Sequence, residues 1–509
     1  MNFYEEYKPF RNYMRRFDLV ESLADVWRYS LYVIENQPLP VDDAIRSSVS
    51  PFKDLKKHLY PWDLDILARE LVLNAGSKND RNLKTREHLA EAVNHIRRLD
   101  DASFRGKGSE PPDVIFELHR IAHRQFPWQV SAGIAPMMRA LKVYGETAVD
   151  AIVVRELGMT AQQFMLLGMA VGGHFMKKPV MSTNQDYEGL GISKESSNAF
   201  FNRITCTTEQ LREATKKRQS YDCDWLYTWN PLEERPLVIF DSAYPDRVLC
   251  PIPRYLSRRT SGGLFFDLAN SAGFSNPFGD SFQAYVGEVI KVTCPAPGFT
   301  ALPEEQYGGK DKKHGVDWLL SDRTGHLFIE CKAKRLTLNA KTLSDPEALD
   351  KDLDVMAKAI VQHYRNIEDA LKSKTRWVPD GLPIYPLILT LEDWFIISPR
   401  VLEMLNKHVR RLLSEAGIDM KVLEEMPYTI ASAHEFEITS QIIAQVGIFS
   451  VMSKKTTPEK QGWALLPLAS DDFKEEMRRI NWHLFANDFG KMLPDEVSHS
   501  YDWQTFKVN

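Results

Sequence analysis

The spacing of apolar residues changes near residue 220. Before that point apolar residues recur every three or four positions, as in segments 64–71 and 114–122, which predicts amphipathic helices. Thr160 and Thr207 each begin a Thr-x-x-Gln capping box, and Gly158 is placed to end the helix before the first box. Residues 1–220 are therefore expected to form a mostly helical region.

Beyond residue 220, short apolar runs typical of strands alternate with helical patterns. Strands are expected at 236–240, 263–266, 315–321, 326–333 and 385–390, and helices at 281–292 and 344–371. The order helix, hairpin, helix, strand predicts an α/β domain with a mixed sheet flanked by helices. We expect this domain to span residues 221–400 and a C-terminal α/β extension, residues 401–509, to pack on it.

Composition excludes several classes of protein. Of the 509 residues 43% are hydrophobic and 26% charged, which is typical of a globular chain and not of a disordered one. The five cysteines are scattered without a Cys-x-x-Cys pair, so neither a disulfide framework nor a cysteine zinc module is expected. No apolar run reaches the ~20 residues of a membrane span, and the first residues do not resemble a secretory signal. We expect a cytoplasmic protein with no membrane partner.

The net charge of -5 argues against a protein that holds nucleic acid by its overall charge, but not against a local basic cleft. Residues 310–341 carry eight Lys and Arg against four Asp and Glu, so eight minus four leaves this segment at +4. The side chains expected to contact nucleic acid are Lys312, Lys313, His314, Lys334 and Arg335. No Gly-Lys pair is followed by Ser or Thr, so there is no P-loop and no nucleotide cofactor is expected.

Residues 314–332 carry the candidate chemistry. Asp322-Arg323-Thr324-Gly325 is typical of a β-turn, and folding the chain about it predicts a hairpin. The expected cross-strand pairs are Ser321 with His326, Leu319 with Phe328, Asp317 with Glu330, and Gly315 with Lys332. Opposed carboxylates destabilise a hairpin unless a cation lies between them, and oxygen ligands suit Mg²⁺ or Mn²⁺. Lys332 lies on the same strand face as Glu330 and could orient a water or a phosphate there.

Asp317, Glu330 and Lys332 together resemble the motif of the PD-(D/E)xK nuclease superfamily, which has the restriction-endonuclease-like fold, over residues 278–400. The resemblance implies that Asp317, Glu330 and the main-chain carbonyl of Cys331 hold the metal, and that Lys332 positions or activates the attacking water. It also implies a further metal-binding Glu on the preceding helix, which Glu288 matches. Gln362 and Tyr285 are candidates for positions around these residues.

The resemblance implies a Mg²⁺-dependent phosphodiesterase that leaves a 5′-phosphate. We favour DNA over RNA and endonuclease over exonuclease action, and the sequence leaves both alternatives open. The N-terminal region would select substrate, sense a trigger or bind a partner, as in a prokaryotic defence effector against phage. The partner would be a second protein or a second copy of the chain.

Three further interpretations fit parts of the pattern. The first is a catalytically inactive, nuclease-like scaffold in a nucleic-acid or defence complex. The second is a surface hairpin with no chemical role, whose acids pair with Lys332, Lys334 and Arg335. The third is a transcriptional regulator built on the N-terminal helices, for which we find no recognition helix in the sequence. The scaffold is the strongest of the three.

Overall fold

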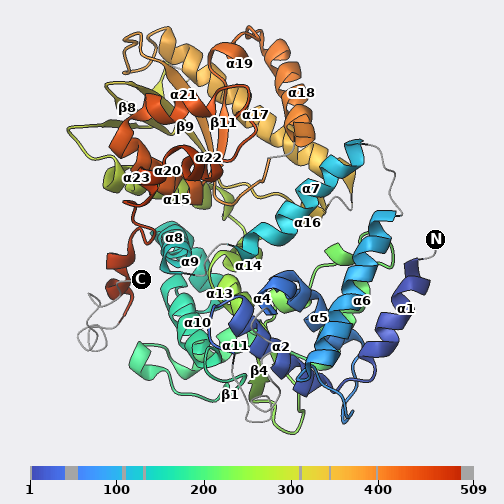
Figure 1. The fold of residues 1–509 in the computed structure, drawn as a ribbon. Helices are drawn as coiled ribbons and strands as arrows, with labels where there is room; N and C mark the ends of the chain where they lie inside the picture. Colours follow the sequence, from blue (N-terminus) through green and yellow to red (C-terminus); the bar gives the residue numbers. More distant parts are fainter. Residues whose placement is uncertain are drawn as a thin grey trace. The chain divides into compact units, whose positions relative to one another are not determined.

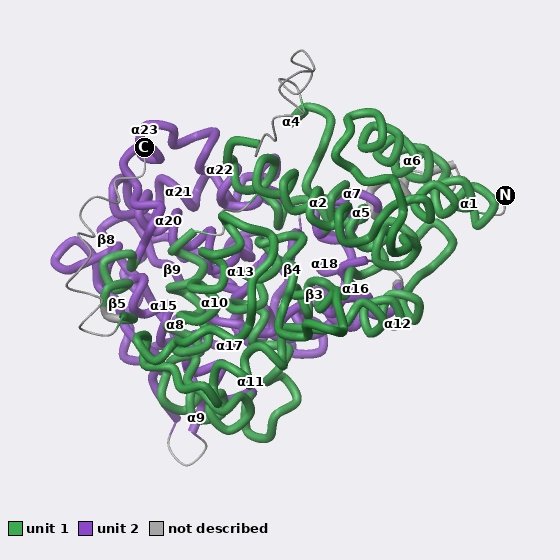
Figure 2. The backbone as a smooth tube through the Cα atoms, turned by 90° about the horizontal axis from the view of Figure 1, so that it is seen from below, with its two compact units in different colours: residues 1–109, 124–274, 485–509 green, residues 110–123, 275–484 purple. Residues whose placement is uncertain are grey.

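The chain forms two compact units in the computed structural model (Figure 2). The structure describes residues 3–39, 55–105, 111–129, 133–308, 312–342, 345–396 and 399–493, so Lys310 and Asp311 of the predicted basic segment lie outside the described residues. Unit 1 comprises residues 1–109, 124–274 and 485–509, and unit 2 comprises residues 110–123 and 275–484. These boundaries differ from the predicted ones at residues 220 and 400.

Unit 1 is mainly helical, in agreement with the helical pattern of the first 220 residues (Figure 1). Its helices are α1 (Phe3–Met14), α2 (Leu19–Val33), α4 (Leu55–His58), α5 (Pro61–Asn74), α6 (Arg86–Arg105), α8 (Ile134–Tyr144), α9 (Thr147–Leu157), α10 (Ala161–Phe175), α11 (Lys194–Ile204), α12 (Thr208–Arg218), α13 (Pro253–Arg259) and α14 (Phe265–Leu268). Helix α7 (Pro111–Gln125) begins in unit 2 and ends in unit 1. Both predicted capping boxes are present, and Gly158 has a φ of 73° at the end of α9.

A small sheet completes unit 1. Its strands are β1 (Val180–Ser182), β4 (Arg247–Leu249), β3 (Leu237–Ile239) and β2 (Thr205–Thr207), in that spatial order. Strand β3 confirms the strand predicted at 236–240. The strand predicted at 263–266 is wrong, because Phe265 begins helix α14 after a 3-10 turn, Gly262–Leu264. A short apolar run does not by itself distinguish a strand from a helical turn.

Unit 2 is built on a five-stranded mixed sheet. The spatial order is β11 (Thr429–Ser432), β10 (Ile384–Thr390), β9 (Gly325–Lys332), β8 (Trp318–Asp322) and β5 (Thr300–Pro303). Strands β5, β8 and β9 are antiparallel neighbours, whereas β9, β10 and β11 run parallel. A separate ribbon pairs β6 (Gln306–Tyr307) with β7 (Lys313–His314). Because β11 belongs to the main sheet, the boundary predicted at residue 400 cuts through one sheet.

Helices flank this sheet. They are α15 (Ser275–Thr293), α16 (Leu338–Thr342), α17 (Pro346–Leu371), α18 (Pro399–Ala416), α19 (Val422–Glu425), α20 (Ala433–Val446), α21 (Ile448–Lys455), α22 (Leu465–Asp472) and α23 (Lys474–Met477). Leu319 and Phe328 share a buried apolar cluster with α17 and α18, so these side chains define the sheet face that α17 covers. Trp318, the neighbour of Leu319, contacts Gly287 of α15 on the opposite face. Among the described residues, no helix is long and apolar enough to cross a membrane.

Candidate active site

The β8–β9 hairpin has the predicted register. Ser321 lies opposite His326, and Leu319 lies opposite Phe328. The turn is stabilised by Asp322, whose Oδ1 accepts hydrogen bonds from the backbone N–H of Thr324 at 2.7 Å and of Gly325 at 3.0 Å. Strand pairing ends at Trp318 and Ile329, so Asp317 and Glu330 come directly after the last pair, at the same end of the hairpin.

The chain leaves the hairpin before Asp317, and the predicted pairing of Gly315 with Lys332 is wrong. The backbone N–H of Gly315 donates to the carbonyl of Glu305 at 3.0 Å, and the carbonyl of Gly315 accepts from Nδ2 of Asn366 on α17 at 3.1 Å. These two bonds hold the chain away from the edge of β9. They are made by residues distant in sequence, which strand alternation does not reveal.

The side chain of Asp317 takes the place of the missing strand. Its Oδ2 accepts a hydrogen bond from the backbone N–H of Cys331 at 2.6 Å. A strand residue directs its N–H and its C=O toward the same edge, so the carbonyl of Cys331 faces the side on which Asp317 lies. The carboxylate and the carbonyl that we predict as metal ligands therefore face a common space.

Glu330 is almost fully buried on the face that α17 covers, with 6% of its surface exposed. Its Oε1 accepts a hydrogen bond from Nζ of Lys332 at 2.6 Å. Its Oε2 is buried and has no hydrogen-bond partner among the residues that the structure describes. The side chain of Lys332 is 36% exposed, so its ammonium group is accessible from the edge of the sheet.

The charges of Asp317, Glu330 and Lys332 do not compensate one another. Burial, and then the negative charge of Glu330, raise the pKa of Asp317 to about 7. Burial opposes ionisation of Glu330, yet the neighbouring His363 and Lys332 lower its pKa overall. Burial likewise disfavours the charge of Lys332, but Glu330 raises its pKa. One ammonium group thus faces two carboxyl groups, and a further positive charge would stabilise the ionised form of both acids.

Glu304 is a third acid at this edge, which the sequence did not indicate. It follows β5 directly, and its backbone N–H donates to the carbonyl of Asp317 at 2.8 Å. Its Oε1 lies 2.7 Å from Nδ1 of His314, and its charge contributes to the raised pKa of Asp317. The strand that places Glu304 here was not predicted, because Thr300–Pro303 lacks a clear apolar alternation.

His363 on α17 is the second residue that sequence reasoning missed. It is 1% exposed, its Nε2 lies 3.1 Å from the carbonyl oxygen of Phe328, and its Nδ1 lies 3.6 Å from Oε2 of Glu330. In the sequence, His363 lies between Val361 and Tyr364 in a helix whose apolar stripe explains the spacing of its residues. No sequence pattern therefore marks His363 as a functional residue. The neighbouring Gln362 donates to Oδ1 of Asn366 at 3.0 Å, so it lies beside the residue that holds Gly315.

Helix α15 places Gln283 against the hairpin. Gln283 donates from Nε2 to Glu304 at 3.4 Å, and its carbonyl accepts from Nε1 of Trp318 at 2.9 Å. Glu288 is exposed on the same helix, and its role as a metal ligand stays a prediction. The hydroxyl of Tyr285 donates to Glu437 of α20 at 2.6 Å, so the structure directs Tyr285 to α20 instead of to the hairpin acids.

The basic side chains fall into two groups. Lys312, Lys313, His314 and Lys334 are exposed. Lys313 pairs with Asp369 at 3.1 Å and Lys334 with Asp352 at 3.3 Å, and in each pair the lysine is exposed whereas the aspartate is buried.

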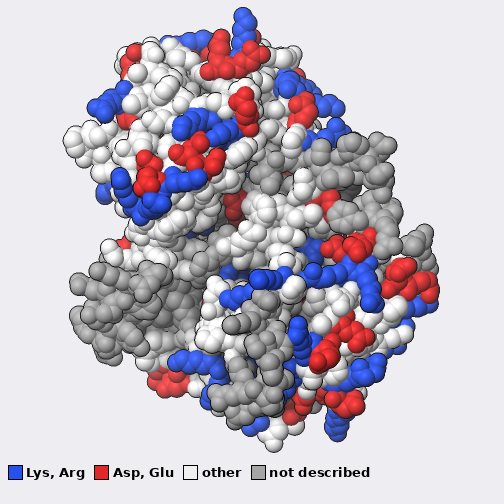
Figure 3. Space-filling model, in the orientation of Figure 1, with Lys and Arg blue, Asp and Glu red and all other residues white. Residues whose placement is uncertain are grey.

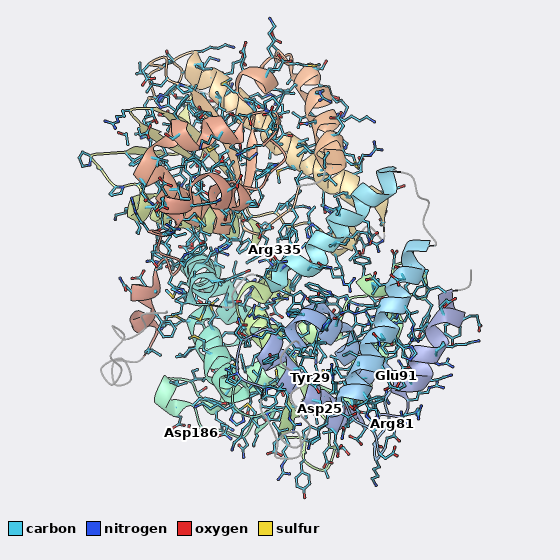
Figure 4. The ribbon with its side chains drawn as sticks, viewed as in Figure 1. Asp25, Tyr29, Arg81, Glu91, Asp186 and Arg335 are labelled. Carbon is cyan, nitrogen blue, oxygen red and sulfur yellow. The ribbon has the colours of Figure 1, made fainter. Side chains whose placement is uncertain are left out.

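Arg335 lies in the loop between β9 and α16 (Figure 4). It is 7% exposed and pairs with Glu392 at 2.9 Å, so it is not among the exposed side chains that we expect to contact a phosphate. On the face shown in Figure 3, Lys and Arg side chains are interspersed with Asp and Glu side chains.

A closed cluster of metal ligands occurs elsewhere in the described part of the chain. Among His, Cys, Asp and Glu side chains there, only Asp222, Cys223 and Asp224 bring three ligand atoms within 4.8 Å of one another. They are consecutive residues, and Asp222 already accepts the backbone N–H of Asp224, so local turn geometry explains the grouping. At the hairpin, an ion held by Asp317 and Glu330 would need the Cys331 carbonyl and water to complete its coordination, as is usual for Mg²⁺.

Comparison with protein-family models, with curated proteins and with solved structures finds no match to this chain. A functional assignment therefore depends on the chemistry of the hairpin and its neighbours.

Proposed function

We propose that this protein is a metal-dependent nuclease that hydrolyses phosphodiester bonds, with DNA as the favoured substrate. The observation that carries the proposal is the end of the β8–β9 hairpin, where Asp317, Glu330 and Lys332 meet. Oε2 of Glu330 is buried there without a hydrogen-bond partner among the described residues. A buried carboxylate oxygen is costly unless a donor or a cation satisfies it, so the residues fit a hard divalent ion.

The architecture of unit 2 supports a restriction-endonuclease-like fold. Helices flank a mixed sheet, and the two acids lie at the end of adjacent central strands, as the PD-(D/E)xK resemblance implies. The two acids and the lysine lie at the C-terminal end of β9, where β8 no longer pairs with it. Substrate would thus meet the acids where the strand edge is open.

The residues divide the chemistry among them. Asp317, Glu330 and the carbonyl of Cys331 would hold Mg²⁺ or Mn²⁺, which when bound supplies positive charge that polarises the phosphate and activates water. Lys332 is partly exposed and carries a full charge, so it would orient a water molecule or stabilise charge on a phosphate oxygen. Lys312, Lys313, His314 and Lys334 would contact neighbouring phosphates. A role in defence against phage would depend on this activity.

One observation favours the inactive scaffold as a second candidate. Asp317 is bonded to the backbone of Cys331, and Glu330 is bonded to Lys332, so both acids contribute hydrogen bonds to the hairpin without any ion. If Asp317 and Glu330 serve only to make these hydrogen bonds, they stabilise the fold and have no catalytic role. Activity and stability of the same variants therefore distinguish the two candidates.

The test is a cleavage assay with matched variants of the full-length protein. Supercoiled plasmid, linear duplex, single-stranded DNA and RNA are incubated with Mg²⁺, Mn²⁺ or a chelator. We expect cleavage only with metal, and a rate lower by about a hundredfold or more in Asp317→Asn and Lys332→Ala. The control variants Glu368→Gln and Lys372→Ala remove another carboxylate–lysine pair, 2.7 Å long and exposed at the C-terminal end of α17, and should stay within about twofold of wild type.

The same assay can contradict the proposal. Equal activity in wild type, Asp317→Asn and Lys332→Ala would show that a contaminating nuclease is responsible. Tight nucleic-acid binding with no cleavage of any substrate would favour the scaffold. Loss of supercoiled plasmid before any shortening of linear duplex would identify an endonuclease.

A further inference from the structure

The buried face between α17 and β9 carries an unexplained pair of atoms. Nε2 of His363 lies 3.1 Å from the carbonyl oxygen of Phe328. A carbonyl oxygen only accepts hydrogen bonds, so Nε2 carries a proton. In the neutral ring the other nitrogen, Nδ1, then presents a lone pair.

With the ring neutral, that lone pair faces a second one; with the ring protonated, Nδ1–H would instead point toward Glu330 and lower its pKa. Nδ1 of His363 lies 3.6 Å from Oε2 of Glu330, beyond hydrogen-bond distance. Both atoms are buried, and neither has a hydrogen-bond partner among the described residues. Two buried acceptor atoms that face each other are unfavourable, because each has lost water without gaining a donor. A positive group between or beside them would remove the cost.

The spacing suits a shared metal ion. Bonds of about 2.1 Å to nitrogen and oxygen place two adjacent ligand atoms about 3.0 to 3.5 Å apart, close to the observed distance. A histidine that binds a metal almost always donates its other ring N–H to a carbonyl or carboxylate, which fixes the ring. His363 already makes that bond, to the backbone of the strand that carries Glu330.

We propose that His363 is a ligand of the metal in this site, that it gives the ion one nitrogen ligand through Nδ1, and that the site prefers a first-row transition ion such as Mn²⁺ to Mg²⁺. This inference rests on the proposed function, because the ion is the one that Glu330 would hold there. Imidazole nitrogen suits transition ions, whereas Mg²⁺ takes oxygen ligands almost exclusively.

The test measures metal binding directly, with Mn²⁺ as the probe and no nucleic acid present. His363→Gln keeps an amide N–H for the carbonyl of Phe328 but removes the Nδ1 lone pair. His119→Gln is the matched control, because His119 is also fully buried and its Nε2 also lies near a carbonyl oxygen, that of Ala340 at 3.3 Å. Thermal unfolding of each variant in chelator establishes that it is folded.

We expect the Kd for Mn²⁺ to rise about tenfold or more in His363→Gln and to change less than twofold in His119→Gln. Electron spin-echo envelope modulation of bound Mn²⁺ should show coupling to a ¹⁴N nucleus in wild type, and this coupling should be lost in His363→Gln. Bound Mn²⁺ without ¹⁴N coupling would overturn the inference and indicate a protonated imidazole at His363. Coupling that persists in His363→Gln would also overturn it, by identifying another nitrogen ligand.

A cleavage assay of the same wild-type preparation separates this inference from the proposed function. ¹⁴N coupling without cleavage would contradict the nuclease and leave the ligand assignment in place. Cleavage without ¹⁴N coupling would support the nuclease and contradict the assignment of His363 as a ligand.

Discussion

At the scale of single residues, two buried aspartates of unit 2 behave in opposite ways. Burial and the charge of Glu330 raise the pKa of Asp317 to about 7. Burial also opposes ionisation of Asp369, but hydrogen bonds from Lys374, Lys313 and Tyr307 lower its pKa to about 2. An acid whose pKa is raised on folding lowers the free energy of unfolding progressively as the pH rises from its unfolded pKa near 4 to the raised value, and the full loss is present above that value. One whose pKa is lowered contributes stability above the unfolded pKa near 4, and this contribution is lost as the pH falls toward 2.

We therefore predict opposite effects of neutralising the two aspartates. At pH 8 in chelator, Asp317→Asn should raise the free energy of unfolding by about 1 kcal/mol, because Asn keeps an acceptor for the N–H of Cys331 and removes a charge beside Glu330. Asp369→Asn should lower it by about 1 kcal/mol, because it weakens the bonds to Lys313 and Lys374. Urea unfolding measures both.

A stabilised but inactive Asp317→Asn protein is what a functional carboxylate predicts. Asp317→Asn that is destabilised by more than about 1 kcal/mol would instead assign Asp317 a structural role, in support of the scaffold.

At the scale of elements, the site depends on how α15 lies against β8. The ring of Trp318 lies over Gly287, and a Cβ atom built at Gly287 would come 2.1 Å from Cζ2 of that ring. Nε1 of Trp318 donates to the carbonyl of Gln283 on the same helix. Trp318 is the first residue of β8 and the neighbour of Asp317, so this contact fixes the backbone from which the Asp317 carboxylate extends.

We predict that Gly287→Ala lowers the free energy of unfolding by about 1 to 3 kcal/mol, because the added methyl group displaces Trp318 or α15. Gly279→Ala, on the same helix with no atom within 4 Å of its Cβ among the described residues, should be neutral or should raise it by about 0.5 kcal/mol. Denaturant titration of both variants checks this. Equal effects at the two positions would show that Trp318 does not lie against Gly287.

At the scale of the whole molecule, each unit is assembled from segments that are distant in sequence (Figure 2). Strand β11 pairs with β10, and the buried residues of α18 share a core cluster with α17. These residues include Val401, Leu405 and Val409, all beyond the predicted boundary at 400. A fragment that ends there would expose the edge of β10 and an apolar face of α17.

We predict that a fragment of residues 221–400 aggregates and lacks a cooperative thermal transition, because an exposed sheet edge and apolar helix face favour association. A fragment of residues 275–484 lacks only residues 110–123 of unit 2 and retains the sheet with α15, α17, α18 and α20, so it should unfold cooperatively. Circular dichroism and size-exclusion chromatography measure the difference. A monomeric, cooperative 221–400 fragment would contradict the division into these two units.

The sequence by itself determined the local features of this protein. The Asp322–Gly325 turn and strand alternation set the β8–β9 register, and the apolar stripe after Asp345 predicted α17, which begins at Pro346 with Asp345 as its N-cap. Each of these depends on residues close in sequence, whose spacing encodes the pattern directly. The approach of Asp317 to Glu330 followed from the same register.

Only the tertiary structure decided what surrounds these acids. Asn366 binds the carbonyl of Gly315, 51 residues earlier in the sequence, and this bond holds Gly315 outside the hairpin. His363 contacts the carbonyl of Phe328, 35 residues earlier, on the strand that carries Glu330. Glu392 pairs with Arg335 and removes it from the surface. Such contacts depend on how helices and strands pack, and periodicity along the chain records which face of an element is buried but not which side chain lies opposite it.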